Sequence, residues 1–360
     1  MLFSILALLL AATGFCAWTF AHLLHLSGVG WTAFPMVLTA AFVPATMLSR
    51  RFHTWLLAAI NVASGIAVGF LSFLLMAAFA SWAAVGSGFL LGLPVDGRLV
   101  ASGFYGAAAL VGILALATAY RLRVTRVTVA LPNLPAYWSG RTLALVSDIH
   151  LGNFRGTGFS RRIVSTLMGL RPDCILVGGD MFDGAKLDVA RAVLPWKALS
   201  APSGVFFVGG NHDDYGGRAA YFDALRGVGM RVLENEKVEI NGLQLVGVHD
   251  RETLQPELFR AILERARVSG ASASILLAHR PSNLSVPEQA GISLQLSGHT
   301  HLGQFWPWTI MARRAHGKYA YGLNRFGRML VLTSSGAGTW GPPFRLGTRS
   351  EVVLIRLEAA

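Results

Sequence analysis

The sequence predicts a chain in two parts, a helical membrane region over residues 1–120 and an α/β domain over residues 121–360. The 360 residues are 53% hydrophobic and only 14% charged, whereas an average soluble domain carries roughly 25% charged residues. The deficit lies at the front, where residues 1–120 hold four charged side chains besides histidine. From about residue 127, short β-rich runs alternate with amphipathic stretches, which is typical of an α/β domain.

Four apolar runs in the front region reach the length of a membrane span. A helix needs ~20 apolar residues to cross the hydrocarbon core. The runs cover about residues 2–26, 31–49, 54–83 and 99–120. The third is long enough to tilt or to extend into the interface. A cleaved signal peptide is disfavoured, because the start has no basic region and further long runs follow. We therefore expect a bundle of about four transmembrane helices.

The basic residues around these runs predict their orientation. Arg50 and Arg51 lie between the second and third runs, and Arg121, Arg123 and Arg126 follow the fourth. Loops rich in Arg and Lys stay in the cytoplasm. We therefore expect a multi-pass protein of the cell (inner) membrane, with the rear domain in the cytoplasm.

Small residues and cysteines in the chain support two minor expectations. Gly65 and Gly69 form a Gly-x-x-x-Gly pattern that could let another helix approach closely. The two cysteines, Cys16 and Cys174, lie in the apolar front and in a predicted buried strand. We therefore expect no disulfide, which suits a reducing compartment.

In the rear domain, apolar β-rich runs and amphipathic segments alternate along the chain. The predicted strands are 142–147, 174–178, 204–208, 243–248, 274–278, 292–297, 329–333 and 351–357. The predicted helices are about 159–170, 187–199, 218–228 and 256–268. This alternation predicts strands buried beneath helices.

Five of the predicted strands end in Asp, Asn or His set among glycines. The blocks, in chain order, are SDIHLG, GGDMFD, GGNHDD, AHRP and SGHTH. Sites in α/β folds gather beyond the carboxyl ends of the strands. Glycine lets the backbone turn sharply there without a side chain in the way. These side chains can therefore converge on one rim of the domain.

The side chains in these blocks indicate a metal site. Imidazole nitrogens and carboxylate oxygens without thiolates suit Mn, Fe or Zn. The Asp-x-His and His-x-His spacings put two donors on the same side of an extended segment. The donors are too many for one tetrahedral ion, whereas two ions sharing a carboxylate account for their number.

The ordered series of blocks resembles the calcineurin-like metallophosphoesterase superfamily, whose pattern is D-x-H, G-D-x-x-D, G-N-H-[DE], H and G-H-x-H. All five blocks are present in order between about residues 142 and 301. The resemblance implies a four-layer α/β/β/α sandwich. The soluble part is also similar to the membrane-associated bacterial branch that includes UDP-2,3-diacylglucosamine hydrolases.

The resemblance also implies a role for each matching residue. One metal would be held by Asp148, His150 and His301, and the other by Asn211, His279 and His299, with Asp180 bridging the two. The expected cofactors are two divalent ions, Mn first, with Fe or Zn as alternatives. A hydroxide bridging the metals would attack phosphorus in line.

Three further residues of the blocks would serve around the metals. By the resemblance, His212 would contact the phosphate and protonate or stabilise the leaving oxygen. Asp213 would orient His212, because a catalytic imidazole needs its second nitrogen held. Asp183 would lie behind the ligands.

Several residues near the blocks leave alternatives open. His249 and Asp250 end the fourth strand and either line the cleft or belong to a loop. Arg155, like its neighbours Arg161 and Arg162, either contacts a phosphate or is solvated. His316 is expected on the surface. The cluster of Phe305, Trp306 and Trp308 either meets the membrane interface or an acyl chain, or forms a local core.

Composition and the membrane region favour one class of substrate. The rear segment holds 28 of the 31 basic and 18 of the 19 acidic residues, a net charge of +10, which favours anionic partners. We expect hydrolysis of a phosphodiester or pyrophosphate bond of a membrane lipid, in preference to nucleic acid. The alternatives are a membrane-anchored enzyme on a soluble nucleotide or nucleic acid, and a non-catalytic membrane receptor. The oligomeric state stays open.

Overall fold

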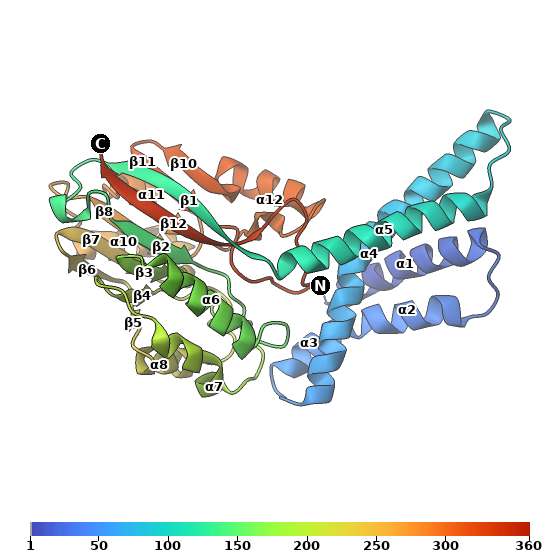
Figure 1. Cartoon of the computed structure of the whole chain (residues 1–360), viewed down its shortest axis with the longest axis horizontal. Coiled ribbons are helices and arrows are strands. Elements are labelled where there is room, and N and C mark those ends of the chain that lie inside the picture. Colours follow the sequence, from blue (N-terminus) through green and yellow to red (C-terminus); the bar gives the residue numbers. More distant parts are fainter. Residues whose placement is uncertain (1) are drawn as a thin grey trace. The chain divides into compact units, whose positions relative to one another are not determined.

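The computed structural model describes residues 2–360 and divides the chain into two compact units (Figure 1). The first unit consists of the residues up to Thr118 together with Gly341–Phe344. The second consists of Ala119–Trp340 together with Arg345–Ala360. The first unit is helical, and the second holds all the strands of the described residues.

The helical unit provides four candidate membrane spans, at Phe3–Leu23, Gly30–Ser49, Trp55–Leu90 and Gly97–Ala119, which confirms the predicted number. Its helices are α1 (Leu2–Leu23), α2 (Gly30–Ala40), α3 (Phe42–Ser49), α4 (Trp55–Leu90) and α5 (Gly97–Ala119). α2 and α3 together make the second span. α4 has 36 residues, about 54 Å at ~1.5 Å per residue, which exceeds a hydrocarbon core of ~30 Å.

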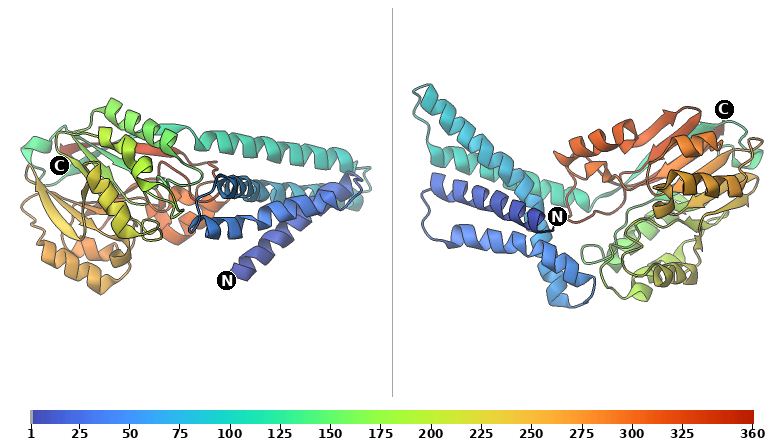
Figure 2. Two further views of the ribbon diagram at one scale, coloured as in Figure 1. Left: turned by 90° about the horizontal axis from the view of Figure 1, so that it is seen from below. Right: turned by 180° about the vertical axis from the view of Figure 1, so that it is seen from behind.

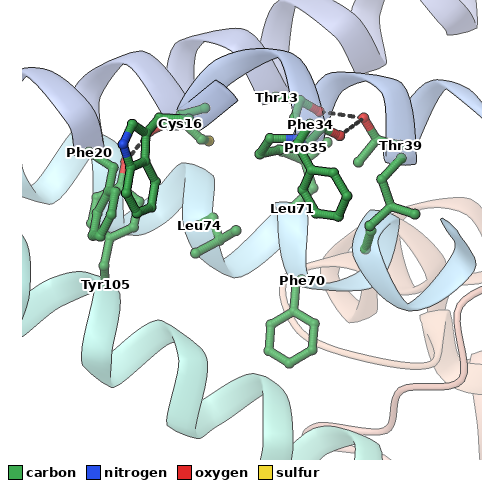
Figure 3. Close-up of a pocket in the computed structure, with 14 residues that line it drawn as sticks. Thr13, Cys16, Phe20, Phe34, Pro35, Thr39, Phe70, Leu71, Leu74 and Tyr105 are labelled. Carbon is green, nitrogen blue, oxygen red and sulfur yellow. Dashed lines mark hydrogen bonds between the residues drawn. The ribbon is translucent and has the colours of Figure 1, made fainter. Parts of the chain in front are cut away.

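A cavity of about 380 Å³ lies among α1, α2, α4 and α5 (Figure 3). Its wall is almost entirely apolar, and its polar groups have partners within the unit. The hydroxyls of Thr13 and Thr39 lie 3.0 Å apart, and each also lies near the carbonyl four residues earlier in its helix. The Tyr105 hydroxyl donates to the carbonyl of Cys16 at 2.7 Å. The cavity therefore offers little but hydrocarbon contact.

At Gly69, the Gly-x-x-x-Gly pattern of α4 does not serve the close approach of another helix. A Cβ on Gly69 would lie 2.2 Å from the Phe344 ring. That ring packs against Phe70, with centroids 5.3 Å apart, and against Phe73. Gly69 therefore makes room for an aromatic side chain from the segment Gly341–Phe344 of the same unit.

The second unit contains two six-stranded sheets. The first sheet has the order β1 (Leu122–Leu131), β12 (Ser350–Ala359), β2 (Thr142–Val146), β3 (Cys174–Val177), β4 (Val205–Phe207) and β5 (Arg231–Val232). The second has the order β10 (Gly322–Phe326), β11 (Met329–Thr333), β9 (Leu294–Ser297), β8 (Ser274–Ala278), β7 (Leu243–Val248) and β6 (Glu236–Ile240). β2 to β5 are parallel, and so are β7, β8, β9 and β11.

Three hydrophobic cores arrange these sheets and their helices into four layers. One core lies between the two sheets and includes Leu145, Leu176, Leu277 and Leu296. A second lies between the first sheet and α6 (Thr157–Leu170), α7 (Val189–Val193) and α8 (Arg218–Gly227). The third joins the second sheet to α10 (Pro256–Ala266) and α11 (Ser285–Gln289), as the view from behind in Figure 2 shows for α10. The predicted α/β/β/α sandwich is confirmed.

Some predictions about side chains of this unit are corrected by their burial. Arg155 is neither solvated nor open to a phosphate: it is 1% exposed and donates to the carbonyl of Ala119 at 2.9 Å. Arg161 and Arg162 are exposed. Cys174 of this unit and Cys16 of the helical unit are both free and buried.

Candidate metal centre

The predicted ligands follow neighbouring parallel strands of both sheets. In the first sheet, Asp148, Asp180 and Asn211 come two, three and four residues after the ends of β2, β3 and β4. In the second sheet, His279 directly follows β8 and His299 comes two residues after β9. Because parallel strands end at the same edge of their sheet, the two sets of loops meet at one rim.

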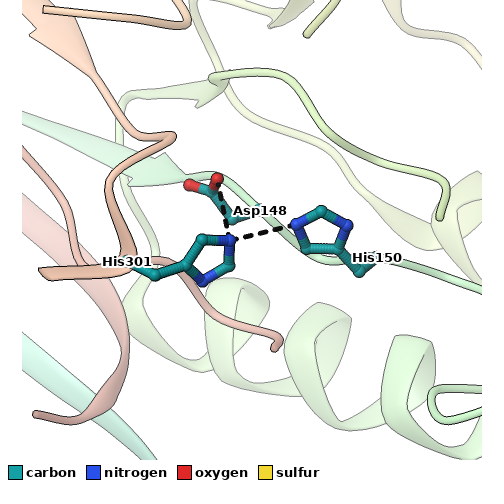
Figure 4. A group of neighbouring side chains, drawn as sticks. All are labelled: Asp148, His150 and His301. Carbon is teal, nitrogen blue, oxygen red and sulfur yellow. Dashed lines mark hydrogen bonds and ion pairs between the residues drawn. The ribbon is translucent and has the colours of Figure 1, made fainter. Parts of the chain in front are cut away.

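One group of donors is formed by Asp148, His150 and His301, with one ligand atom of each within 4.8 Å of the others. The Nε2 atoms of His150 and His301 lie 3.1 Å apart, and Nε2 of His301 lies 3.4 Å from Oδ1 of Asp148. Figure 4 shows the two imidazoles turned toward each other beside the carboxylate. All three side chains are buried.

A second group is formed by Asp180, His279 and His299, also with ligand atoms within 4.8 Å of one another. Nε2 of His279 lies 3.1 Å from Oδ2 of Asp180. The Oδ1 atom of Asn211 is buried and has no hydrogen-bond partner. A buried acceptor without a partner costs about 1–3 kcal/mol, so this oxygen is available to a ligand.

Asp180 stands between the two groups. Its Oδ2 faces His279 at 3.1 Å and Nε2 of His150 at 3.7 Å, while its Oδ1 accepts a hydrogen bond from the backbone N–H of His212 at 2.8 Å. One oxygen of this carboxylate therefore points toward imidazoles from both groups, and the other is used to hold the carboxylate in place.

The backbone of this rim is strained at the residues that carry the donors. Asp148, His150, Asp180, His299 and His301 have φ angles of 54°, 53°, 52°, 69° and 47°. Residues with a Cβ rarely adopt such angles, and each costs about 1–3 kcal/mol. Strain of this kind persists where the surrounding structure enforces it, and it gathers at functional sites.

The glycines of the blocks leave room for the carboxylates. A Cβ on Gly210 would lie 2.2 Å from Oδ1 of Asp180, and a Cβ on Gly298 would lie 2.2 Å from Oδ2 of Asp148. The backbone N–H of His299 donates to both carboxylate oxygens of Asp148, at 2.9 and 3.1 Å. Glycine at position 210 therefore lets the loops after β3 and β4 approach each other, and glycine at position 298 lets the second-sheet loop close on Asp148 of the first sheet.

Electrostatic coupling within the rim is strong. Burial raises the pKa of Asp148, the His279 imidazole opposes this shift, and the Asp180 carboxylate adds to it. For Asp180, burial is outweighed by the imidazoles of His279 and His150, which hold the pKa well below its usual range. For His279, burial lowers the pKa, but the carboxylate of Asp180 raises it to about 10. Because imidazole binds a metal only when it is neutral, metal binding here would displace that proton.

The ring of His212 is 8% exposed and lies between the buried donors and an aromatic surface. It packs against Tyr215 and Trp340, with ring centroids 4.9 and 6.1 Å away. Tyr215 is 49% and Trp340 58% exposed. Burial, followed by the nearby His150, lowers the pKa of His212 to about 4, so the ring is neutral at pH 7.

Two acidic residues near His212 have different partners. Nδ1 of His212 lies 3.8 Å from the carboxylate of Asp183. The carboxylate of Asp213 instead accepts from the backbone N–H groups of Asp180, Gly210 and Phe182, at 2.9, 2.8 and 3.1 Å. These hydrogen bonds of Asp213 tie together the loops after β3 and β4, and the acid beside the His212 ring is Asp183.

Arg345 is a buried residue of this rim that the motifs do not reveal. It is 0% exposed and donates to the carbonyls of His301, Ser335 and Gly338 at 3.1, 2.7 and 2.7 Å. Gly338 in turn donates from its N–H to the carbonyl of Asp148 at 2.8 Å. Arg345 therefore connects the loop of His301 to the loop that runs along Asp148. It lies outside every motif and every apolar run, so the sequence carries no signal for it.

Three further residues near the blocks are His249, Asp250 and His316, and each has neighbours within the domain. His249 and Asp250 are 0% and 2% exposed. A Cβ on Gly209 would lie 2.7 Å from the His249 ring, and Asp250 pairs with Arg280 at 2.8 Å. His316 is half-buried, with its ring centroid 6.2 Å from that of His299.

The donors fit divalent metal ions. Two nitrogen ligands at ~2.0–2.1 Å from one ion lie about 3.0–3.4 Å apart, and Nε2 of His150 and of His301 are 3.1 Å apart. Nε2 of His279 and Oδ1 of Asn211 are buried without a hydrogen-bond partner. The nitrogen and oxygen donors suit Mn, Fe or Zn equally.

Comparison with known proteins identifies the family. A family model described as calcineurin-like phosphoesterase matches residues 141–303. A metallophosphoesterase of Helicobacter pylori is 35% identical over 222 residues, which cover 60% of this chain and 59% of that protein. A Danio rerio protein described as a transmembrane protein with metallophosphoesterase domain is 32% identical over 254 residues, 66% of this chain and 58% of that protein.

A metallophosphoesterase of Aquifex aeolicus is 31% identical over 269 residues, which cover 70% of this chain and 97% of that protein. The chain thus spans nearly all of this relative, but only about three fifths of the length of the Helicobacter pylori and Danio rerio relatives. The family resemblance inferred from the five blocks is confirmed. With its four apolar helices, the chain is a membrane protein that belongs to the calcineurin-like metallophosphoesterase family.

Proposed function

We propose that the domain over residues 121–360 is a metal-dependent phosphoesterase with a dinuclear centre. One ion would be held by Asp148, His150 and His301, the other by Asn211, His279 and His299, with Asp180 shared. The observation that carries the proposal is the position of Asp180, whose Oδ2 faces His279 at 3.1 Å and His150 at 3.7 Å. When bound, two such ions supply an activated water and stabilise charge on the displaced oxygen.

The residues around the ions have separate tasks in this proposal. His212, a neutral imidazole at the border of the buried donors, donates a hydrogen bond to the leaving oxygen from Nε2, because its Nδ1 is buried without a hydrogen-bond partner. The carboxylate of Asp183 lies 3.8 Å from Nδ1 of His212, beyond hydrogen-bond distance, while Asp213 holds the backbone that carries Asp180. The exposed rings of Tyr215 and Trp340 beside His212 form an apolar border around the reacting phosphate.

The proposed substrate is a membrane lipid with a phosphodiester or pyrophosphate bond, and Mn²⁺ is the proposed metal. Four membrane-length helices on the same chain support a lipid substrate, as do the aromatic border at His212 and the net charge of +10 in the rear segment. The orientation proposed from Arg50, Arg51 and the basic residues after residue 120 places the domain on the cytoplasmic side of the inner membrane.

The experiment is a substrate screen with the purified full-length protein in detergent and Mn²⁺. Lipid pyrophosphates and lipid phosphodiesters in mixed micelles are compared with a water-soluble aryl phosphodiester. We expect metal-dependent turnover that is highest on a lipid substrate. Turnover of soluble diesters alone would refute the lipid substrate and favour a membrane-anchored enzyme that acts on a soluble nucleotide or nucleic acid.

A pair of variants tests the role of His212 in the same screen. His212→Asn should lower kcat by about 10²–10³-fold, the usual effect of removing a positioned hydrogen-bond donor at a developing oxyanion, and leave the metal content unchanged. Glu257→Gln, at a side chain on α10 that is 89% exposed, serves as the matched control and should keep full activity. A protein that binds two metals but hydrolyses none of the substrates would be a receptor, and the catalytic proposal would fail.

A further inference from the structure

Helix α12 (Trp308–His316) follows the His299–His301 block and has no buried residue. Most helices of a folded domain bury one face, because burial of that face is what stabilises them. On α12, Ile310 and Met311 are 44% and 56% exposed, and Trp306 just before it is 45% exposed. Large apolar side chains therefore gather on the outside of this helix.

The charges along the chain on either side of α12 are all of one sign. Arg313, Arg314 and Lys318 lie at its carboxyl end and are exposed. Between Glu288 and Glu351 the chain contains no acidic residue, whereas it contains seven Arg and Lys residues. A partner for this surface must therefore accept apolar side chains and carry negative charge.

The interface of an anionic bilayer has both properties. Helices that lie in that interface combine exposed aromatic and aliphatic side chains with Arg and Lys and few acids. Each Arg or Lys near an anionic leaflet contributes about 1 kcal/mol. Four helices of this chain are long and apolar enough to cross a membrane, so a bilayer is always within reach of the second unit.

We propose that α12, together with Trp306 and Lys318, is a membrane-docking surface that lies in the head-group region of an anionic leaflet. This surface is called the α12 surface below. Its residues are exposed within the part of the chain that the structure describes, and their chemistry selects an anionic lipid surface over a neutral one.

The α12 surface is joined to the candidate metal centre at both ends. At its start, a Cβ on Gly303 would lie 2.3 Å from the backbone of Trp308, so the turn after His301 packs tightly on the helix. At its end, the ring of His316 lies 6.2 Å from that of His299. Docking would therefore hold the centre next to lipid phosphates, a consequence that rests on the proposed function, whereas the docking itself does not.

The experiment uses the full-length protein in lipid nanodiscs, with an environment-sensitive fluorophore on Met311→Cys. The native Cys16 and Cys174 are buried. Glu257→Cys on α10, at a side chain that is 89% exposed, carries the same label as the matched control. Quenching by lipids brominated on their acyl chains reports contact with the bilayer, and quenching by iodide reports contact with water.

In discs with anionic lipid, the label at position 311 should be quenched by brominated lipid and protected from iodide, and the label at position 257 should show the reverse. Arg313→Glu together with Arg314→Glu should lower the ratio of docked to undocked α12 by at least about 30-fold, at ~1 kcal/mol for each lost basic residue. A label at 311 that is open to iodide, or shielded from both quenchers by protein, would overturn the proposal.

A second assay on the same discs separates this inference from the proposed function. Turnover of a water-soluble aryl phosphodiester with Mn²⁺ reports the metal centre without requiring docking. Lipid contact at position 311 without any turnover would support membrane docking of the α12 surface and refute the proposed phosphoesterase activity. Turnover without lipid contact would refute membrane docking of the α12 surface and support the proposed phosphoesterase activity.

Discussion

The two units of this chain treat buried polar groups in opposite ways. In the helical unit, buried hydroxyls donate to nearby backbone carbonyls: Ser81 donates to the carbonyl of Ala77 at 2.7 Å, and Tyr105 donates to the carbonyl of Cys16 at 2.7 Å. In the α/β unit, the rim of the sheets buries atoms without a hydrogen-bond partner, among them Oδ1 of Asn211. The difference locates the chemistry: the first unit is built to be inert in lipid, and the second keeps donors open for a ligand.

The backbone shows the same contrast. Five proposed ligands lie at positive φ, a conformation that costs about 1–3 kcal/mol for each residue. In the helical unit, the described non-glycine residue with positive φ is His25, just after α1. A unit that is stable without a ligand has no need of such strain, whereas a preorganised metal site does.

The largest effect should come from the carboxylate shared by the two donor groups. Asp180→Asn removes the charge that faces both His150 and His279, so we expect turnover to fall by at least about 10³-fold, equal to ~4 kcal/mol of barrier. The measurement is the metal-dependent hydrolysis rate of the full-length protein. Glu257→Gln is the control, and a Asp180→Asn protein with more than a tenth of the activity would contradict the shared carboxylate.

The next effect concerns the buried arginine of the rim. Arg345→Met leaves the carbonyls of His301, Ser335 and Gly338 without their donor, at about 1–3 kcal/mol each. We expect the free energy of unfolding to fall by at least about 3 kcal/mol, or about 6–12 °C in Tm for a unit of this size. Thermal unfolding measures it, with Arg349→Met at the exposed neighbouring arginine as control. Equal Tm values for the two variants would show that Arg345 is not structural.

Metal removal should have a somewhat smaller effect on stability. If a metal is present at about 100 times its Kd, its removal by a chelator costs the folded state about 2.7 kcal/mol. We expect Tm to fall on chelation and to return when Mn²⁺ is restored. The Asp180→Asn protein should respond much less, because its site is incomplete. If the Tm of the native protein is the same before and after chelation, the rim does not depend on a bound metal for its stability.

The smallest effect is expected in the helical unit. Thr39→Val removes a buried hydroxyl that lies 3.0 Å from that of Thr13, and hydrogen bonds between membrane helices contribute about 0.6 kcal/mol. We expect a Tm within about 2 °C of the native value. A loss as large as that of Arg345→Met would break the contrast between the two units.

The sequence predicts those parts of the fold that local patterns determine. β7 and β8 were expected at residues 243–248 and 274–278, where the structure places them, because each is a short, mainly apolar run between polar turns. The five blocks name the predicted ligands because each set of donors is contiguous with its strand. The structure adds that these donors lie close together in space, which no single block of sequence could show.

Other features depend on contacts that are distant in sequence. β1 was missed because its arginines, Arg123 and Arg126, indicate a membrane-flanking segment, and it becomes a strand by pairing with β12, more than 200 residues later. α12 was missed because its inner face, formed by Thr309, Ala312 and His316, is only partly buried and carries no large apolar side chain. Arg345 was missed because its role is defined by the carbonyls around it.

The most direct test of the central claim is anomalous diffraction from crystals of the full-length protein loaded with Mn²⁺. We expect two peaks about 3.5–4 Å apart at the rim of the two sheets, with the Asp180 carboxylate touching both and the imidazoles of His301 and His279 on different ions. A single peak, or peaks away from these side chains, would contradict a dinuclear centre in this chain.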